Sequence, residues 1–203
     1  MEIDQSRKIM ILGDSGWGKT TLMLSIINEL ASRWHVYIYN TDFEQFPITN
    51  MITPMKPDIN NVSNVEYLSL VIDRMRAKFK NYVFVITDLD KFFESTSPMS
   101  KISDSLKDLY GTGRHQRILV IVETKQPRYI PSKLLANSNL FYIGKFTEQE
   151  DIRRLKGYIS AEEMAQLQKH EFWEYDKNTG NKRKVKVMDG EIQYLEGENN
   201  DGM

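Results

Sequence analysis

The chain has 203 residues, of which 40% are hydrophobic, so it is long enough to bury one full hydrophobic core. Its 27 Lys and Arg residues are balanced by 28 Asp and Glu residues, which excludes a uniformly basic nucleic-acid-binding protein and leaves only local basic patches for DNA. The chain has no cysteine, which excludes disulfides and thiolate metal sites, and its longest apolar runs, Tyr82–Ile86 and Ile118–Val122, are far below the ~20 residues of a membrane span. We expect a soluble protein with no membrane span.

Short apolar runs alternate with helical patterns along the chain, and this alternation predicts an α/β fold with a mostly parallel sheet. Lys8–Leu12 is predicted to be a buried strand that ends at Gly13. The segment Lys19–Ser32 is predicted to be a helix because its apolar residues recur every four positions. The next expected elements are a strand at His35–Asn40, an irregular segment at 47–63, a helix at Val65–Phe79, a strand at Tyr82–Thr87, a helix near Ile102–Tyr110 ended by Gly111 and Gly113, and a strand at Arg117–Val122.

The C-terminal third predicts shorter elements. Residues 124–131 are expected to be irregular, and Leu140–Ile143 is expected to be the last core strand. Capping boxes predict two short helices, one from Thr147 with Glu150 and one from Ser160 with Glu163. A hairpin is predicted where the strands Glu171–Tyr175 and Lys182–Val187 flank Asn178-Thr179-Gly180, and residues 196–203 are expected to form an acidic flexible tail.

A phosphate-binding motif lies between the first predicted strand and the first predicted helix. The segment Gly13–Thr20 matches G-x-x-x-x-G-K-[ST], in which glycines let backbone N–H groups surround phosphate oxygens. Lys19 is expected to reach the β- and γ-phosphates, Thr20 to bind Mg²⁺, and the helix N-terminus to attract the anion. Trp17 is expected to shield the loop rather than to stack on a base. The residues predicted to bind ATP are Gly13, Asp14, Ser15, Gly16, Trp17, Gly18, Lys19, Thr20 and Thr21. This motif predicts one P-loop ATPase domain over residues 1–195.

A carboxylate for the metal is predicted at the end of another strand. Asp88 follows the apolar run Val83–Ile86, where a Walker B aspartate belongs, and is expected to hold Mg²⁺ together with Thr20. The next residue is Leu89, although a glutamate often activates the attacking water at that position. Asp90 is a candidate for this task, or for capping the following helix. Glu123 and Glu44 are further candidates for the water-activating residue.

One more polar residue is predicted to report on the γ-phosphate. Gln126 lies just past the strand that ends near Val122, at a position where a side chain can contact the γ-phosphate or the attacking water. We therefore predict a sensor role for Gln126.

Four segments, in this order, resemble the FtsK–HerA superfamily of DNA-pumping ATPases. They read GDSGWGKT, VFVITDLD, GTGRHQRILVIVETKQPRYIP and ANSNLFYIGKFTEQEDIRRL, and the similarity runs through residues 7–187. The best match is the viral branch, the genome-packaging ATPases of membrane-containing icosahedral viruses of archaea and bacteria. The resemblance implies a RecA-like core with helices on both faces of the sheet and a C-terminal β-hairpin. It also implies a homo-oligomeric ring, expected to be a hexamer, that moves double-stranded DNA without reading its sequence, with a capsid or portal partner. The expected location is the host cytoplasm, or the virion vertex.

The resemblance also implies an arginine that acts on the neighbouring subunit's γ-phosphate. Arg114 matches that position best, and Arg117 and Arg128 are the reserves. Basic residues of the predicted hairpin are candidate DNA contacts, as is Lys101 after the Walker B strand. The hairpin residues concerned are Lys177, Lys182, Arg183, Lys184 and Lys186.

Other classes of P-loop protein fit the sequence less well. A GTPase requires D-x-x-G and [NT]-K-x-D, but the chain has Asp88-Leu89-Asp90-Lys91 and Thr124-Lys125-Gln126-Pro127, so ATP is the expected nucleotide. A small-molecule or nucleotide kinase usually carries an arginine-rich lid, which the sequence does not show. A nucleotide-dependent assembly or partitioning ATPase that moves nothing remains an alternative, because Leu89 replaces the usual acidic residue.

Overall fold

The computed structural model describes residues 7–41, 46, 49–55, 65–93 and 103–195. Over this part of the chain the strands form one sheet in the order β3-β2-β4-β5-β1-β6-β7-β8-β9. The six strands from β3 through β6 in this order pair parallel to one another. Strands β7, β8 and β9 follow β6 as an antiparallel extension. The strand bounds are β1 Lys8–Leu12, β2 His35–Tyr39, β3 Ile52–Met55, β4 Tyr82–Ile86, β5 Ile118–Thr124, β6 Leu140–Ile143, β7 Glu171–Asp176, β8 Lys182–Met188 and β9 Glu191–Tyr194.

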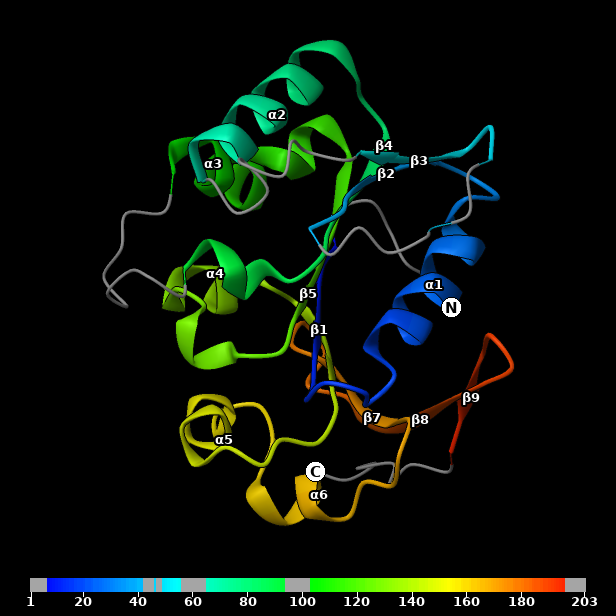
Figure 1. The fold of residues 1–203 in the computed structure, drawn as a ribbon, viewed down its shortest axis with the longest axis vertical. Coiled ribbons are helices and arrows are strands. Elements are labelled where there is room, and N and C mark those ends of the chain that lie inside the picture. The colour runs from blue at the N-terminus through cyan, green and yellow to red at the C-terminus, as the bar shows by residue number, and fades with distance from the viewer. Residues whose placement is uncertain (1–6, 42–45, 47–48, 56–64, 94–102, 196–203) are drawn as a thin grey trace.

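Helices cover both faces of the sheet, with α1 on one side and α2 to α5 on the other (Figure 1). The α-helices are α1 Lys19–Leu30, α2 Val65–Lys78, α3 Asp104–Thr112, α4 Ser132–Asn137, α5 Gln149–Leu155 and α6 Ala161–Ala165. Three 3-10 helices are η1 Leu89–Phe92, η2 Gly113–Gln116 and η3 Pro127–Tyr129. Among the described residues, none of the helices has both the length and the apolar character that crossing a membrane requires. The predicted α/β fold, with helices on both faces and a C-terminal hairpin, is confirmed.

The central strands are buried on both faces because each contributes to two separate hydrophobic cores. In β1, Ile9 and Ile11 pack with α1, whereas Met10 and Leu12 face the core beneath the helices of the other side. The same alternation holds in β4 and β5, and every residue of these three strands is buried. This explains why the central strands are continuous apolar runs, as expected for parallel strands covered by helices.

The strand order brings three strand ends together at one edge of the sheet. Strand β5 lies between β1, which leads into the P-loop, and β4, which leads into Asp88. Because the three strands are parallel, their carboxyl ends share one edge, where α/β proteins bind ligands. Strand β5 runs to Thr124, two residues beyond its predicted end at Val122, so Glu123 lies within the sheet between β1 and β4.

Several predicted elements differ from the structure. The segment 47–63 was expected to be irregular, but it contains β3. Among the described residues β3 is an edge strand with no strand partner on its outer side, so it tolerates Pro54. The segment after Thr124 contains η3, and α4 follows it. Helix α3 continues through Gly111 to Thr112, and β9 extends the sheet beyond the predicted hairpin. These elements are short, or they violate local propensity, so the sequence pattern does not reveal them.

The two predicted capping boxes have opposite outcomes. The Ser160 box is confirmed, since the Glu163 N–H donates to Ser160 Oγ at 3.1 Å and the Ser160 N–H donates to Glu163 Oε2 at 2.7 Å. The Thr147 box is wrong, because α5 begins later, with Glu148 at its N-cap. Thr147 instead donates to the P-loop residue Asp14.

The predicted hairpin is confirmed. Strands β7 and β8 pair antiparallel, and Gly180 in the turn has a φ of 76°. Three predictions fall outside the described residues, namely the roles of Glu44 and Lys101 and the acidic tail at 196–203.

Candidate functional site

The P-loop connects the end of β1 to the start of α1, as its motif predicts. Gly16 and Gly18 have positive φ angles of 73° and 100°, which glycine adopts without a steric penalty. Gly18 is also the N-cap of α1, and the Leu22 N–H donates to its carbonyl oxygen at 2.9 Å. A Cβ on Gly18 would lie 2.4 Å from His170 Nδ1, so a glycine is required here for a second reason.

Two P-loop side chains hold the loop against the rest of the protein. Asp14 Oδ2 accepts hydrogen bonds from the N–H and the Oγ1 of Thr147, both at 2.9 Å. The Trp17 indole N–H donates to the Glu171 carbonyl oxygen at 2.8 Å, and its ring packs so closely on Gly144 that a Cβ there would lie 2.4 Å from Trp17 Cδ1. Asp14 and Trp17, predicted to contact ATP, therefore have side chains engaged by the protein and do not line the cavity described next.

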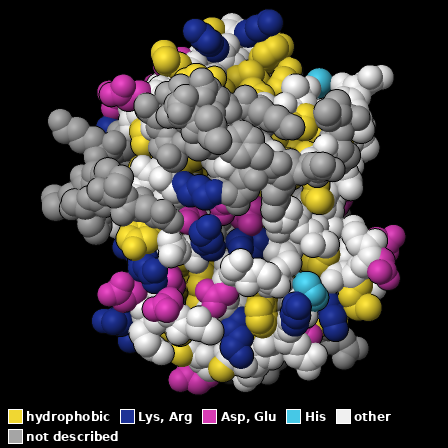
Figure 2. All heavy atoms as spheres, in the orientation of Figure 1, with side chains coloured by type: hydrophobic (Ala, Val, Ile, Leu, Met, Phe, Trp, Pro, Cys, Tyr) yellow, Lys and Arg dark blue, Asp and Glu magenta, His cyan; other side chains and the backbone are white. Residues whose placement is uncertain are grey.

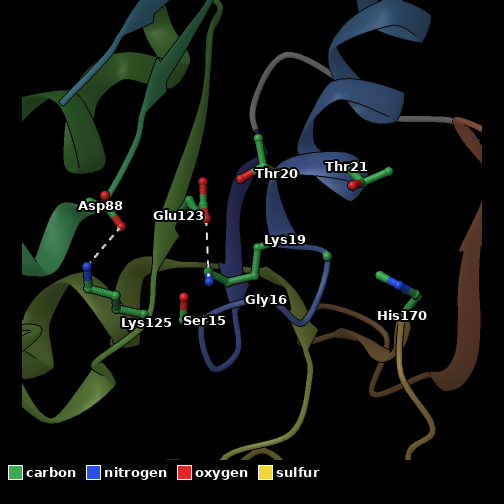
Figure 3. A pocket seen from close by; sticks show the side chains of 10 residues that line it. Ser15, Gly16, Lys19, Thr20, Thr21, Asp88, Glu123, Lys125 and His170 are labelled. Carbon is green, nitrogen blue, oxygen red and sulfur yellow. Dashed lines mark ion pairs between the residues drawn. The ribbon is translucent and has the colours of Figure 1, made fainter. Parts of the chain in front are cut away.

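A cavity of about 360 Å³ opens beside the P-loop at the carboxyl edge of the sheet. Most of the side chains that line it are polar or charged, and Figure 3 shows them. They are Ser15, Gly16, Gly18, Lys19, Thr20, Thr21, Asp88, Glu123, Lys125 and His170. The structure therefore brings the predicted phosphate-binding and metal-binding residues together, because Lys19, Thr20 and Asp88 line one cavity.

Lys19 is the central cation of the cavity. Its side chain is almost fully buried, and its Nζ lies 3.2 Å from the Asp14 carbonyl oxygen and 3.6 Å from Glu123 Oε1. Figure 3 shows the Lys19 and Glu123 side chains pointing toward each other across the cavity. A buried ammonium held by these two oxygens is poised to exchange them for phosphate oxygens.

Asp88 is a buried carboxyl at the opposite wall. It is 4% exposed, and its φ of 41° is an unusual left-handed conformation for a residue other than glycine. Burial raises the pKa of Asp88 to about 6, and the nearby Glu123 adds to this rise. Lys125 opposes it, with its Nζ 4.0 Å from Asp88 Oδ1, and Lys91 Nζ lies 3.2 Å from Oδ2. A bound divalent cation would remove the cost of burying this negative charge.

Thr20 and Asp88 fit a magnesium site, since both line the cavity with oxygen atoms and one of them is a buried carboxylate. Within the described residues, no group of three or more His, Cys, Asp or Glu is arranged to hold a metal ion. Magnesium does not need such a cage, because it keeps several waters and takes phosphate oxygens as ligands beside one or two protein groups.

Asp90, predicted to activate water or to cap a helix, lies outside the cavity lining. It is fully buried, and its Oδ1 accepts hydrogen bonds from Thr124 Oγ1 at 2.6 Å and from the Lys125 N–H at 3.1 Å. Asp90 therefore ties the loop after β4 to the end of β5. This contact fixes the backbone that carries Glu123 and Lys125.

Gln126, the predicted sensor, is not among the residues that line the cavity, whereas Lys125 is. Successive side chains in an extended strand alternate between opposite faces. Glu123 and Lys125 face the cavity, and Thr124 between them points toward Asp90. The Gln126 N–H donates to Thr124 Oγ1 at 3.3 Å, on that other side of the chain.

The predicted arginines lie far from the cavity of their own chain or are engaged elsewhere. Arg114 belongs to η2, which precedes β5, and β5 then carries the chain roughly 16 Å from Ile118 to Glu123. Arg117 directly precedes β5, so it lies with Arg114 at the amino end of this strand, opposite to the cavity. Arg128 binds the buried Asp151 twice, through its N–H at 2.8 Å and through Nη1 at 2.9 Å.

Sequence reasoning missed two residues of the cavity, Lys125 and His170. The alternation along β5 is a signal for Lys125, since it follows Glu123 by two residues. No local signal marks His170, which reaches the P-loop from the turn before β7, about 150 residues away in sequence.

Solved structures with the same fold include viral genome-packaging NTPases and a bacterial protein that contains ATPase domains. The genome-packaging NTPase B204 of Sulfolobus turreted icosahedral virus 2, in complex with ATP-γS, is 16% identical over 92% of this chain and 100% of its own, with a TM-score of 0.75. B204, the DNA-packaging ATPase of Sulfolobus turreted icosahedral virus, gives 17% identity, the same coverage and a TM-score of 0.75. Thermomonospora curvata EccC (ATPases 2 and 3) is 13% identical over 97% of this chain but only 39% of its own, with a TM-score of 0.62.

These matches confirm the fold expected from the resemblance to the FtsK–HerA superfamily and its viral branch. No curated protein sequence matches the chain. A protein-family model described as "Poxvirus A32 protein" matches residues 3–193, which is almost the whole chain and includes every residue of the cavity. This chain belongs to the poxvirus A32 protein family.

Proposed function

We propose that this chain is an ATP-hydrolysing motor subunit that translocates double-stranded DNA, without sequence preference, during packaging of a viral genome into a preformed capsid. The observation that carries the proposal is the convergence of Lys19, Thr20 and Asp88 on one cavity at the carboxyl edge of the sheet. The family match and the fold shared with genome-packaging NTPases support it. Residues 1–195 form the ATPase domain in this proposal.

The P-loop binds the triphosphate of ATP. Backbone N–H groups of residues 13–20 surround the phosphates, and the Lys19 ammonium exchanges its contacts with Asp14 and Glu123 for phosphate oxygens. The Thr20 hydroxyl and the Asp88 carboxylate are the residues that would hold Mg²⁺. When bound, the metal supplies positive charge that neutralises the transferred phosphoryl group.

Glu123 activates the attacking water. The residue after Asp88 is the buried Leu89, which has no group to accept a proton. The Asp90 carboxyl is held by Thr124 and the Lys125 backbone outside the cavity. Of the three acidic candidates Asp90, Glu123 and Glu44, Glu123 is the one supported by a position in the cavity, 3.6 Å from the lysine that binds the γ-phosphate.

Lys125 senses the γ-phosphate in place of Gln126. Its ammonium lies 4.0 Å from Asp88 Oδ1, where it offsets the buried carboxylate. Two cations repel each other, so with a divalent cation held at Asp88 the Lys125 ammonium would turn from this carboxylate toward the phosphates. Gln126 then acts indirectly, by shaping the turn through its hydrogen bond to Thr124.

Arg114 acts on the ATP of a neighbouring subunit. Its place before β5, at the edge of the sheet opposite to the cavity, supports action in trans rather than on its own nucleotide. Such an arrangement requires a closed ring, for which a hexamer is the expected size. Arg128 is less suitable for this task, because Asp151 already holds it.

We place the DNA surface within the ring rather than on the C-terminal hairpin. Two of the hairpin cations are engaged within the chain, since Lys182 pairs with Glu163 at 2.8 Å and Arg183 pairs with Glu174 at 2.6 Å. On the face that Figure 2 shows, the Lys and Arg side chains are interspersed with Asp and Glu rather than gathered in one basic patch. Non-specific contact with phosphates therefore depends on residues brought together by assembly, in the host cytoplasm or at a virion vertex with its capsid or portal partner.

The first test is steady-state ATP hydrolysis across a range of protein concentrations, with and without double-stranded DNA. Turnover that rises with DNA and increases more than linearly with protein concentration is the expected result. Turnover that is indifferent to both leaves a nucleotide-dependent assembly ATPase and removes the translocase. Loss of turnover in Lys19→Ala tests the phosphate site itself.

A mixing experiment tests the role of Arg114. Arg114→Ala subunits and Lys19→Ala subunits are each expected to be inactive alone. In a mixture, an Arg114→Ala subunit keeps an intact P-loop and receives an arginine from its Lys19→Ala neighbour, so part of the activity should return. Absence of any recovery, with mixed rings demonstrated by native mass spectrometry, contradicts action in trans.

A further inference from the structure

The cavity has two ends, and the metal-binding end accounts for only one of them. Figure 3 shows Asp88 and Lys125 on one side of Lys19, and Thr21 and His170 on the other. All of these residues line the same cavity. In the proposed function the β- and γ-phosphates lie at Lys19, with the metal toward Asp88. The α-phosphate and the nucleoside of ATP then extend toward Thr21 and His170.

His170 is held rigidly at this second end. The turn that carries it is closed by the Glu171 N–H, which donates to the Gln168 carbonyl oxygen at 3.0 Å. The Val187 N–H of β8 donates to the His170 carbonyl oxygen at 3.1 Å, and the Trp17 indole N–H donates to the Glu171 carbonyl oxygen at 2.8 Å. The P-loop and the β7–β8 extension therefore fix the backbone on both sides of His170.

The backbone of His170 has a conformation that few residues other than glycine adopt. Its φ is 67°, in the left-handed region that favours glycine, with asparagine and aspartate more tolerant than most other residues. Residues other than glycine that are held in this region are conformationally strained, and such strain is concentrated at functional sites. Its imidazole is half-buried against the Gly18 backbone, where a Cβ on Gly18 would meet Nδ1 at 2.4 Å. The ring therefore lies directly beside the start of α1 and contributes to the cavity wall.

We propose that His170 forms a nucleoside subsite, in which the flat imidazole ring stacks on the base of the bound nucleotide. This inference rests on the proposed function, since it requires ATP in the cavity. The ring is aromatic, lines the cavity beside Gly18 and lies on the opposite side of Lys19 from Asp88, which places it to contact a purine. The Asp88 end binds charge, and the His170 end recognises the part of the ligand that a bare polyphosphate lacks.

Equilibrium binding of two probes tests the subsite, with Mg²⁺ present and with binding measured by calorimetry. The probes are ATP and inorganic tripolyphosphate, which lacks a nucleoside. His170→Asn removes the aromatic ring and keeps a residue that tolerates the left-handed backbone. Stacking of a base on an aromatic side chain is worth roughly fivefold to 150-fold in affinity. His170→Asn should weaken ATP binding within this range and leave tripolyphosphate binding unchanged.

A second variant separates stacking from hydrogen bonding. His170→Phe keeps a flat ring without ring nitrogens, so ATP affinity should return to within a few-fold of the unmodified chain. Thermal denaturation of both variants confirms that each is folded. ATP affinity unchanged in His170→Asn overturns the subsite, and so does an equal loss for ATP and tripolyphosphate, which would assign His170 to the phosphates. If the unmodified chain binds neither probe, the nucleotide site of the proposed function fails as well, so the two failures are distinguishable.

Discussion

Replacing Asp88 by asparagine should stabilise the nucleotide-free protein while abolishing its ATP hydrolysis. Burial raises the pKa of Asp88 from 3.8 to about 6, so the folded state binds this proton more tightly than the unfolded state does. The free energy of unfolding therefore falls as pH rises from about 4 to above 6, and the loss is complete once the folded carboxyl is ionised. Asparagine has the same shape and carries no charge, so the Asp88→Asn variant does not lose this stability.

The size of the effect follows from the two pKa values. A tenfold difference in acid strength corresponds to about 1.4 kcal/mol, so the difference between 3.8 and 6 amounts to at most about 3 kcal/mol. For a chain of this size, 1 kcal/mol moves the melting temperature by roughly 2–4 °C. Asp88→Asn should therefore melt up to about 10 °C above the unmodified protein at pH 8, and close to it at pH 4. Loss of the contacts with Lys91 and Lys125 reduces the gain, which makes this an upper limit.

The measurement is thermal or urea unfolding followed by tryptophan fluorescence, in EDTA and without nucleotide, at several values between pH 4 and pH 8. Asp104→Asn is a control of opposite sign, because Lys107 lowers the pKa of the exposed Asp104 carboxyl. Loss of this carboxylate should slightly destabilise the protein at neutral pH. If the stability difference between Asp88→Asn and the unmodified chain does not change with pH, Asp88 is not a destabilising buried charge. That result would refute the proposal that Asp88 is a buried charge which a divalent cation stabilises.

Three further substitutions test other contacts of the site. Glu123→Gln should lower the rate constant for ATP hydrolysis by roughly 100-fold to 10,000-fold and leave ATP affinity within a few-fold, since it removes only the group that accepts the proton; near-normal turnover would exclude Glu123 as the base. Trp17→Phe should cost on the order of 1 kcal/mol in unfolding free energy, because the Glu171 carbonyl loses its indole donor, and urea titration measures this cost. Gly144→Ala should lower the free energy of unfolding by about 1–3 kcal/mol, because its Cβ would lie 2.4 Å from Trp17. Gly111→Ala in α3 is the control, because nothing lies within 4 Å of its Cβ, and it should be neutral or slightly stabilising. Equal effects of the two substitutions would contradict the tight packing of Gly144 against Trp17 of the P-loop.

Features that depend on neighbouring residues in the chain were predictable from the sequence. The P-loop is contiguous, so eight residues specify both the turn and its ligand. The Ser160 capping box and the hairpin at Gly180 are local in the same way, and both are confirmed. The central strands were predictable because burial on both faces leaves continuous apolar runs. The Thr147 box failed because the N–H and the hydroxyl of Thr147 both donate to Asp14 on a distant segment, and α5 begins later, with Glu148 at its N-cap.

The composition of the cavity required the tertiary structure, because it depends on strand order and register. Only the insertion of β5 between β1 and β4 brings Glu123 to Lys19 and turns Lys125 toward Asp88. The sequence by itself determined the P-loop between β1 and α1 and the acidic residue Asp88 after β4, since each is encoded by adjacent residues. The fold decided which acidic residue and which lysine face that loop, and it brought His170 to the loop from the far end of the chain, because contacts between distant segments are set by packing and not by any local pattern.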